Sequence, residues 1–245
     1  MTLKTKIIDL MPSKLELAAR YYFNKTLGRL EPEAAIIGEL TQQRRRCLDI
    51  GANVGLYTYR FAQLFESVES FEPIPACARI IASSKQDNVR LHNLALSNRQ
   101  GRADLSIPAT GGPEATALAS LSNEFPGADL LSVELRTLDS FGFTQVDLIK
   151  IDVEGHELEV LEGGLETIRR ELPTLLIEIE QRHHASRSIH DIFDFILRLG
   201  YAGSFYWNGR MAPLAEFSVP RHQQSIDPRS QDYVNNFIFR PAAKL

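Results

Sequence analysis

The sequence predicts an α/β fold: a doubly wound, mostly parallel sheet with two helices before it and an antiparallel strand pair at its end. Short apolar segments of strand length alternate with amphipathic helical segments along most of the chain, which is typical of parallel βαβ units. A turn with two glycines follows the first apolar segment and leads directly into a helical pattern. Turns of this kind lie at the carboxyl edge of a parallel sheet, where nucleotide-like ligands bind.

The composition indicates a globular protein with a large core. Of the 245 residues, 44% are hydrophobic and 24% are charged, which excludes a disordered chain. A formal net charge of -4 and a pI near 5.9 argue against a nucleic-acid partner. Cys47 and Cys77 lie in apolar segments, and no apolar stretch near the N-terminus is long enough for a signal peptide or a spanning helix. We therefore expect a cytoplasmic protein that does not bind membranes, with a homodimer left open.

Two helical patterns open the chain, from about Ser13 to Gly28 and from Glu31 to Leu40. Proline at position 32 favours a first helical turn there. We expect these helices to form an N-terminal extension of residues 1–43, followed by the main domain at residues 44–245.

The main domain continues with alternating elements. Strands are expected at Cys47–Ile50, Val68–Phe71, Val89–Leu94, Val146–Ile151 and Leu175–Ile179. Helices are expected at Leu56–Phe65, Ile74–Lys85, Leu158–Arg170 and Ile189–Leu199.

An insertion at about residues 101–138 interrupts this alternation. Two β-rich stretches, Ala103–Ile107 and Ser132–Leu138, flank a segment rich in glycine, proline, alanine and serine. The pattern predicts an inserted hairpin with a mobile loop, Thr110–Asp129, over one face.

The C-terminus supplies the antiparallel pair. Tyr201–Trp207 and Tyr233–Phe239 have strand character, and an Asn208-Gly209 turn follows the first of them.

The glycine turn carries the strongest functional signal. Asp49 ends the first strand, and Gly51, Asn53 and Gly55 follow it. The spacing differs from the G-x-G-x-x-G of dinucleotide sites, and an acidic strand end repels a pyrophosphate. It suits a ligand with an ammonium group and a sulfonium, as in S-adenosylmethionine. Glu72 ends the next strand, where an acidic side chain accepts the two ribose hydroxyls of an adenosine.

Four blocks of the sequence, DIGANVGLYT, SFEPIP, DLIKIDVEGHELEVLEG and YVNNFIF, together resemble the FkbM family of methyltransferases. The resemblance implies a class I methyltransferase (Rossmann-like) fold, S-adenosylmethionine as cofactor, and transfer to a hydroxyl of a sugar, polyketide or related metabolite. It makes Asp49, Gly51, Asn53 and Gly55 the cofactor loop and places Glu72 on the ribose. It also puts Asn93 near the adenine pocket.

A second group of polar residues surrounds the end of the fourth strand. Period-two spacing puts Lys150, Asp152 and Glu154 on one side of the chain, where they need a mutual ion pair or exposure. We expect Asp152 to face the place where methyl donor and acceptor meet. His156, at or near a helix N-terminus, is a candidate general base, and an equally weighted alternative is that it only caps the loop.

The fifth strand also ends in polar residues. Glu180 and His183, together with Glu154, are expected to contact the acceptor. A divalent metal on Asp152, Glu180 and His183 is an alternative that no tight ligand repeat supports, so no metal is assigned. His222 and Gln223, before the last strand, are candidates for the acceptor pocket.

The expected reaction is an in-line displacement in which an acceptor hydroxyl attacks the sulfonium methyl and His156 or Asp152 takes the proton. Two alternatives remain open at this stage. One is methylation of nitrogen or of a macromolecule, and the other is a catalytically silent cofactor-binding module.

Overall fold

A computed structural model describes residues 13–109, 116, 118–122, 125–184, 187–228, 230 and 232–244. Its centre is an eight-stranded sheet with the order β10-β9-β11-β8-β7-β1-β2-β3. The strands are β1 (Arg46–Ile50), β2 (Ser67–Phe71), β3 (Val89–His92), β7 (Val146–Ile151), β8 (Thr174–Glu178), β9 (Tyr201–Trp207), β10 (Arg210–Pro213) and β11 (Asn236–Pro241). The five strands that are adjacent in the order β8-β7-β1-β2-β3 pair in parallel. β11 is antiparallel to both β8 and β9. The predicted doubly wound sheet with a terminal antiparallel pair is confirmed.

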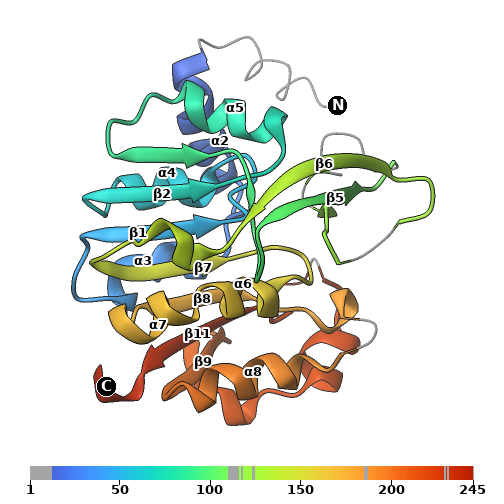
Figure 1. The fold of residues 1–245 in the computed structure, drawn as a ribbon. Helices are drawn as coiled ribbons and strands as arrows, with labels where there is room; N and C mark the ends of the chain where they lie inside the picture. Colours follow the sequence, from blue (N-terminus) through green and yellow to red (C-terminus); the bar gives the residue numbers. More distant parts are fainter. Residues whose placement is uncertain are drawn as a thin grey trace.

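Helices cover both faces of the sheet (Figure 1). They are α2 (Ser13–Thr26), α3 (Glu33–Leu40), α4 (Leu56–Ala62), α5 (Pro75–Ser83), α6 (Glu157–Gly163), α7 (Leu165–Glu171) and α8 (Ile189–Arg198). Short helical turns occur at Leu138–Phe141, Gln181–His183, Leu214–Glu216, Pro220–Gln224 and Ala242–Lys244. Within the described part of the chain, every helix is too short or too polar to cross a bilayer.

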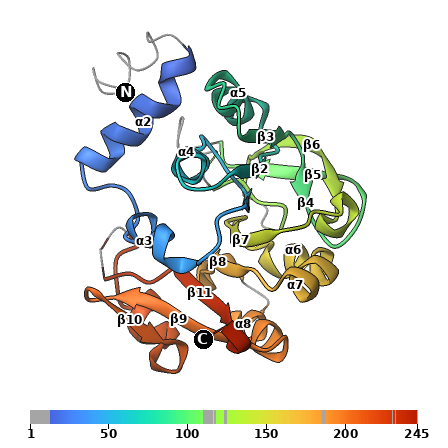
Figure 2. The same cartoon turned by 90° about the vertical axis from the view of Figure 1, so that its left-hand side faces the viewer.

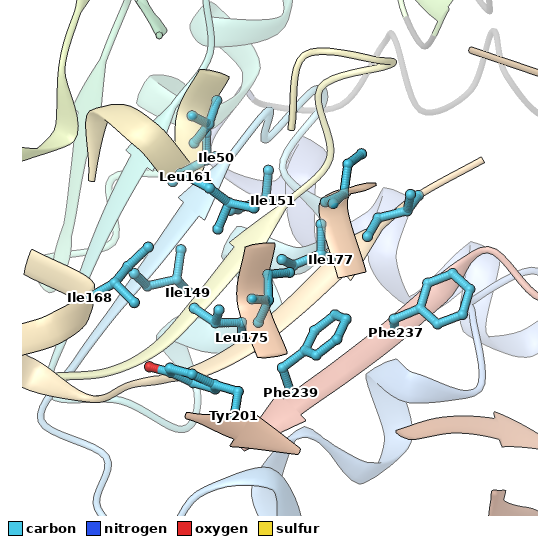
Figure 3. Close-up of a cluster of buried hydrophobic side chains, with 14 of the residues drawn as sticks. Ile50, Ile149, Ile151, Leu161, Ile168, Leu175, Ile177, Tyr201, Phe237 and Phe239 are labelled. Carbon is cyan, nitrogen blue, oxygen red and sulfur yellow. The ribbon is translucent and has the colours of Figure 1, made fainter. Parts of the chain in front are cut away.

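Side chains alternate between the two faces along each strand. Ile149 and Ile151 of β7 pack with α6, α7 and α8, in the cluster that also holds Ile177 and Phe237 (Figure 3). Leu148 packs on the opposite face, against α3 and α4. The same alternation sends Asp49 and Lys150, and Glu178 at the end of β8, toward the α3 and α4 face. Polar strand ends are thus gathered on one side of the sheet.

The insertion contributes β5 (Gly101–Ile107) and β6 (Asp129–Arg136) to a second, three-stranded sheet, and the third strand is β4 (Ala95–Leu96), which precedes the insertion and pairs with β6. β5 and β6 pair antiparallel, which confirms the predicted hairpin. The hairpin extends beyond one edge of the main sheet (Figure 1). Much of the predicted mobile loop, Thr110–Asp129, lies outside the described residues. One described part, Ser120, pairs with Ser106 of β5.

Both N-terminal helices form where the sequence predicts them. α2 packs against α4 and α5, and α3 packs against the sheet. The grouping of residues 1–43 as a separate extension stays a prediction. Both cysteines are buried free thiols.

Three local features differ from the sequence prediction. The predicted helix Leu158–Arg170 is divided into α6 and α7 at Gly164, whose φ of -113° departs from helical geometry. β10 was not predicted, and it follows a hairpin turn in which Asn208 and Gly209 both have positive φ, as a type I′ turn requires. The last strand begins at Asn236 rather than Tyr233.

Candidate functional site

A cavity of about 320 Å³ lies at the carboxyl edge of β1, β2, β7 and β8, within the size range of small-molecule sites. The glycine turn and the ends of these strands form its floor. The wall comes from the N-terminal segment, through Tyr21, Arg29, Leu30, Glu31 and Ala34, and from the insertion, through Thr116, Ala119 and Leu121. No residue of β9 or β10 is part of this lining.

The glycine turn is folded so that its backbone is close to the strand ends. Gly51 has φ of +78°, and a Cβ there would lie 1.7 Å from the carbonyl oxygen of Asp152. Its N–H and that of Ala52 both donate to the carbonyl oxygen of Phe71. Asn53 also has positive φ. Gly55 does not line the cavity. It begins α4, and a Cβ there would lie 2.7 Å from the Ile81 side chain, so its role is in packing.

Glu72 is buried at the cavity wall and accepts two backbone hydrogen bonds, from Asn53 N–H to Oε2 and from Ile74 N–H to Oε1, each at 2.7 Å. Burial raises the pKa of Glu72 to about 7, although these two hydrogen bonds oppose the shift. A carboxylate oxygen can accept more than one hydrogen bond. Glu72 therefore fixes the turn and still has acceptor capacity for two ligand hydroxyls.

Asn93 is placed differently from the expectation. Its exposed amide donates to the carbonyl oxygens of Glu72 at 2.7 Å and Pro73 at 3.0 Å, so it holds the turn after β2 and does not line the cavity. Leu94, Ala95 and Leu96 line the cavity instead. This part of the wall is apolar, as the face of an adenine ring requires.

The centre of the site is a buried ion pair. Lys150 is 1% exposed, its Nζ lies 2.8 Å from Oδ2 of Asp152, and it lies 4.4 Å from the ring centroid of Tyr57. Burial alone would lower the pKa of Lys150, but nearby carboxylates, foremost Asp152 and Glu31, raise it above its ordinary value. The ion pair required by the spacing of Lys150 and Asp152 is thus present.

Asp49 pairs in register with Lys150 and is 1% exposed. Its Oδ2 accepts a hydrogen bond of 2.6 Å from Thr58 Oγ1, while Oδ1 has no hydrogen-bond partner among the described residues. Burial raises the pKa of Asp49 to about 6, against the opposing effect of Lys150. An unpaired, buried carboxylate oxygen in a cavity wall favours a positively charged ligand group.

Of the three residues that the sequence analysis expected to contact the acceptor, one lines the cavity and two do not. Glu154 lines the cavity, has φ of +52°, and pairs with Nδ1 of His183 at 2.7 Å. His183 stands behind it, outside the lining. Glu180 is bound by Arg182 and Tyr233 and is also outside the lining, because the chain turns into a short helix directly after it.

His156 lines the cavity, but both of its ring nitrogens are engaged. Nε2 lies 2.9 Å from Ser97 Oγ, and Nδ1 lies 2.9 Å from Ser122 Oγ. Burial lowers the pKa of His156. The ring therefore joins the start of α6 to Ser97, directly after β4, and to Ser122 of the insertion, which is the loop-fixing role that the sequence left open.

His222 and Gln223 do not line the cavity. Gln223 donates to the carbonyl oxygens of Ile179 and Val234, and His222 is buried among Phe205, Trp207 and Phe217. Both residues hold the segment before β11 in place, so their expected contact with the acceptor is corrected.

Sequence reasoning missed two carboxylates of the cavity. Glu178, whose Oε1 accepts from Asn235, is the last residue of β8 and faces the same side as Leu176. Glu31 accepts from Tyr57 at 2.5 Å and from Asn236 at 3.1 Å. The two-residue period along β8 could have indicated that Glu178 faces the same side as Leu176. No local pattern in the sequence indicated that Glu31 belongs to the site.

The alternative metal set of Asp152, Glu180 and His183 is not brought together. Among the described residues, the acidic side chains close enough to share one ion are those of Asp152, Glu154 and Glu178. Asp152 already pairs with Lys150, and we assign no metal.

Comparison with known proteins agrees with this geometry. A family model described as "Methyltransferase FkbM domain" matches residues 49–202. The chain is 32% identical to the 2-O-methyltransferase NoeI of Sinorhizobium fredii over 168 residues, which cover 60% of this chain and 68% of NoeI. It is 28% identical to Methyltransferase 1 of Beauveria bassiana, over 47% of this chain and 57% of that protein.

A solved structure shares the fold. The methyltransferase FkbM of Methylobacillus flagellatus superposes with a TM-score of 0.53 at 14% identity, over 94% of this chain and 55% of that one. The present chain therefore spans little more than half of that protein. The strand order and this likeness together show the class I methyltransferase fold.

The buried ion pair leads to a prediction about stability. In Lys150→Met, the carboxylates around Lys150 lose their buried cation, so the free energy of unfolding should fall by about 3–5 kcal/mol at pH 8. The folded-state pKa values of Asp49 and Glu178, which burial already raises, then rise further above the unfolded values. Such groups contribute stability below the unfolded pKa and lose it as pH rises through the folded pKa. The deficit should therefore shrink between pH 8 and pH 5 in urea titrations.

The matched control is the double variant Lys150→Met/Asp152→Asn, which removes one of the uncompensated charges and should recover part of the loss. A deficit that is equal at both pH values, or a double variant no more stable than Lys150→Met, would contradict this role of Lys150.

Proposed function

This chain belongs to the FkbM methyltransferase family, and on that premise we propose that it transfers the methyl group of S-adenosylmethionine to a hydroxyl oxygen of a small-molecule acceptor. One observation carries the proposal: the Asp49–Asn53 turn and Glu72 share a single cavity with the carboxylates at the ends of β7 and β8. The cavity thus has a donor side and an acceptor side. The similarity to NoeI, a 2-O-methyltransferase, supports oxygen as the methylated atom.

The donor side fits S-adenosylmethionine. The unpartnered Oδ1 of Asp49 suits the positive charges of the donor, and Glu72 retains acceptor capacity for the ribose hydroxyls. There is no space for a side chain at Gly51 beside Asp152, so the glycine turn packs directly against the end of β7, and its residues Gly51 to Asn53 line the cavity. Leu94–Leu96 offer an apolar surface for the adenine. When bound, S-adenosylmethionine supplies an electrophilic methyl group on a sulfonium.

The acceptor side is rich in carboxylates, with Glu31, Asp152, Glu154 and Glu178 in the lining. Carboxylate oxygens accept hydrogen bonds from hydroxyl groups, and these bonds are stronger than those between neutral groups. An acceptor with several hydroxyls, such as a sugar, can satisfy more of these oxygens than an apolar acceptor can. This favours a polyhydroxyl substrate.

Asp152 is better placed than His156 to receive the proton. Its Oδ2 is held by Lys150, while Oδ1 has no partner among the described residues and the side chain is 27% exposed toward the cavity. As the acceptor oxygen bonds to the methyl carbon, the bond from that carbon to sulfur would break and leave neutral S-adenosylhomocysteine, and the hydroxyl proton would pass to Asp152. His156 would first have to break its bond to a serine. We assign it the positioning of the loop.

The proposal includes a cytoplasmic location, since both thiols are free and persist under reducing conditions. The proposed partner is the small-molecule acceptor. We propose no nucleic-acid or membrane partner, and we leave open whether two copies of the chain form a homodimer.

Glu72→Ala tests the donor side. The loss of the charged acceptor of the ribose hydroxyls should weaken binding of S-adenosylhomocysteine by about 2–4 kcal/mol, measured by calorimetry. The matched control is Glu69→Ala, three residues earlier in β2, which loses ion pairs to Arg46 and His92 outside the cavity. It should reduce stability and leave binding unchanged. Unaltered binding in Glu72→Ala, or binding of NAD in place of S-adenosylhomocysteine by the wild type, would refute the donor site.

Asp152→Asn tests the chemistry. It preserves shape and removes the proton acceptor, so kcat should fall by roughly 10²–10⁴, measured as S-adenosylhomocysteine release with a panel of sugars and other polyols. His156→Ala should have the smaller effect on kcat. If His156→Ala loses more turnover than Asp152→Asn while its cofactor affinity is normal, the proton acceptor is His156.

A further inference from the structure

Two of the described cavity residues are cations. Six carboxylates line the same cavity: Glu31, Asp49, Glu72, Asp152, Glu154 and Glu178. Lys150 is compensated by its ion pair with Asp152. The guanidinium of Arg29, by contrast, has no ion pair or hydrogen bond with any described residue, although Arg29 lines the cavity. Arg29 is exposed, and its guanidinium can pair with an anionic group of a ligand that enters the cavity.

The backbone of Arg29 is held on both sides. At the end of α2, Gly28 has φ of +64° and its N–H donates to the carbonyl oxygen of Lys25. The N–H of Arg29 donates to the carbonyl oxygen of Asn24. These two hydrogen bonds cap the helix. Two residues further on, Glu31 is fixed by Tyr57 and Asn236. In Figure 2 this connection runs from α2 to α3 along the left side of the view. The Arg29 side chain thus extends from an anchored segment.

We infer that Arg29 binds the α-carboxylate of the methyl donor, a role that rests on the proposed function. The amino-acid end of S-adenosylmethionine carries an ammonium and a carboxylate. The unpartnered Oδ1 of Asp49 can take the ammonium, whereas the carboxylate would be repelled by the six acidic groups. Lys150 is already paired, so among the described cavity residues Arg29 is the cation that can neutralise this carboxylate, and its planar guanidinium fits a carboxylate with two hydrogen bonds.

This assignment gives the N-terminal segment a part in donor binding. The segment that carries Arg29 also carries Leu30 and Glu31, which line the same cavity. Donor carboxylate and acceptor hydroxyls are therefore contacted by neighbouring residues of one connection.

The test compares ligands that differ in one group. S-Adenosylhomocysteine has the carboxylate, its decarboxylated analogue lacks only that group, and 5′-methylthioadenosine lacks the whole amino-acid end. In Arg29→Ala, calorimetry should show affinity for S-adenosylhomocysteine reduced by about ten- to a hundredfold, the effect of losing hydrogen bonds between charged groups. Affinity for the other two ligands should not change.

Two variants serve as controls. Lys25→Ala removes a cation from the last turn of α2 outside the cavity lining and should bind all three ligands as the wild type does. Arg29→Lys keeps the charge and loses the planar fork, so its affinity for S-adenosylhomocysteine should lie between those of the wild type and Arg29→Ala.

Two results would overturn the inference. Equal losses for all three ligands would make Arg29 a structural residue, and unchanged S-adenosylhomocysteine affinity with a raised KM for the acceptor would assign it to an anionic acceptor. Failure of the proposed function is distinct, because the wild type itself would then not bind S-adenosylhomocysteine.

Discussion

The site depends on one buried ammonium group. Lys150 lies in the interior of a parallel sheet, where an unpaired charge would be costly, and Asp152 pairs with it directly. Asp49, Glu31 and Glu178 also act on its charge. Because this cation is present, three neighbouring strands can end in carboxylates on the same face without the repulsion that would otherwise separate them. It also fixes one oxygen of Asp152, which leaves the other to face the ligand cavity.

The same charge network connects distant parts of the chain. Glu31 lies before α3 and is held by Tyr57 of α4 and Asn236 of β11, so the N-terminal segment and the last strand are joined at the cavity wall. On the opposite side, His156 joins the start of α6 to Ser97 and to Ser122 of the insertion. A class I sheet thus supplies the floor of the cavity, and these two additions supply much of its wall.

Sequence reasoning succeeded where the signal was local. A strand, a glycine turn and a helix fix Asp49, Gly51 and Asn53 within a few residues, and the next strand end fixes Glu72. It failed for Asn93 and Glu180, because the direction of a side chain after a strand depends on the turn that follows. Glu31 and Arg29 gave no signal, since their place in the site is created by contacts across the fold. His156 was predicted to be either a general base or a residue that caps the loop, and local sequence could not decide between them because its two serine partners are distant in sequence.

The central claim is that this cavity brings a methyl donor together with a hydroxyl acceptor beside Asp152. The most direct measurement is to supply S-adenosylmethionine labelled with ¹³C in its methyl group together with a set of polyhydroxyl acceptors, and to identify the labelled product by NMR. The account predicts a methyl carbon bonded to oxygen, formed by the wild type and almost lost in Asp152→Asn. Label found on nitrogen, or no transfer to any acceptor by a protein that binds S-adenosylhomocysteine, would contradict it.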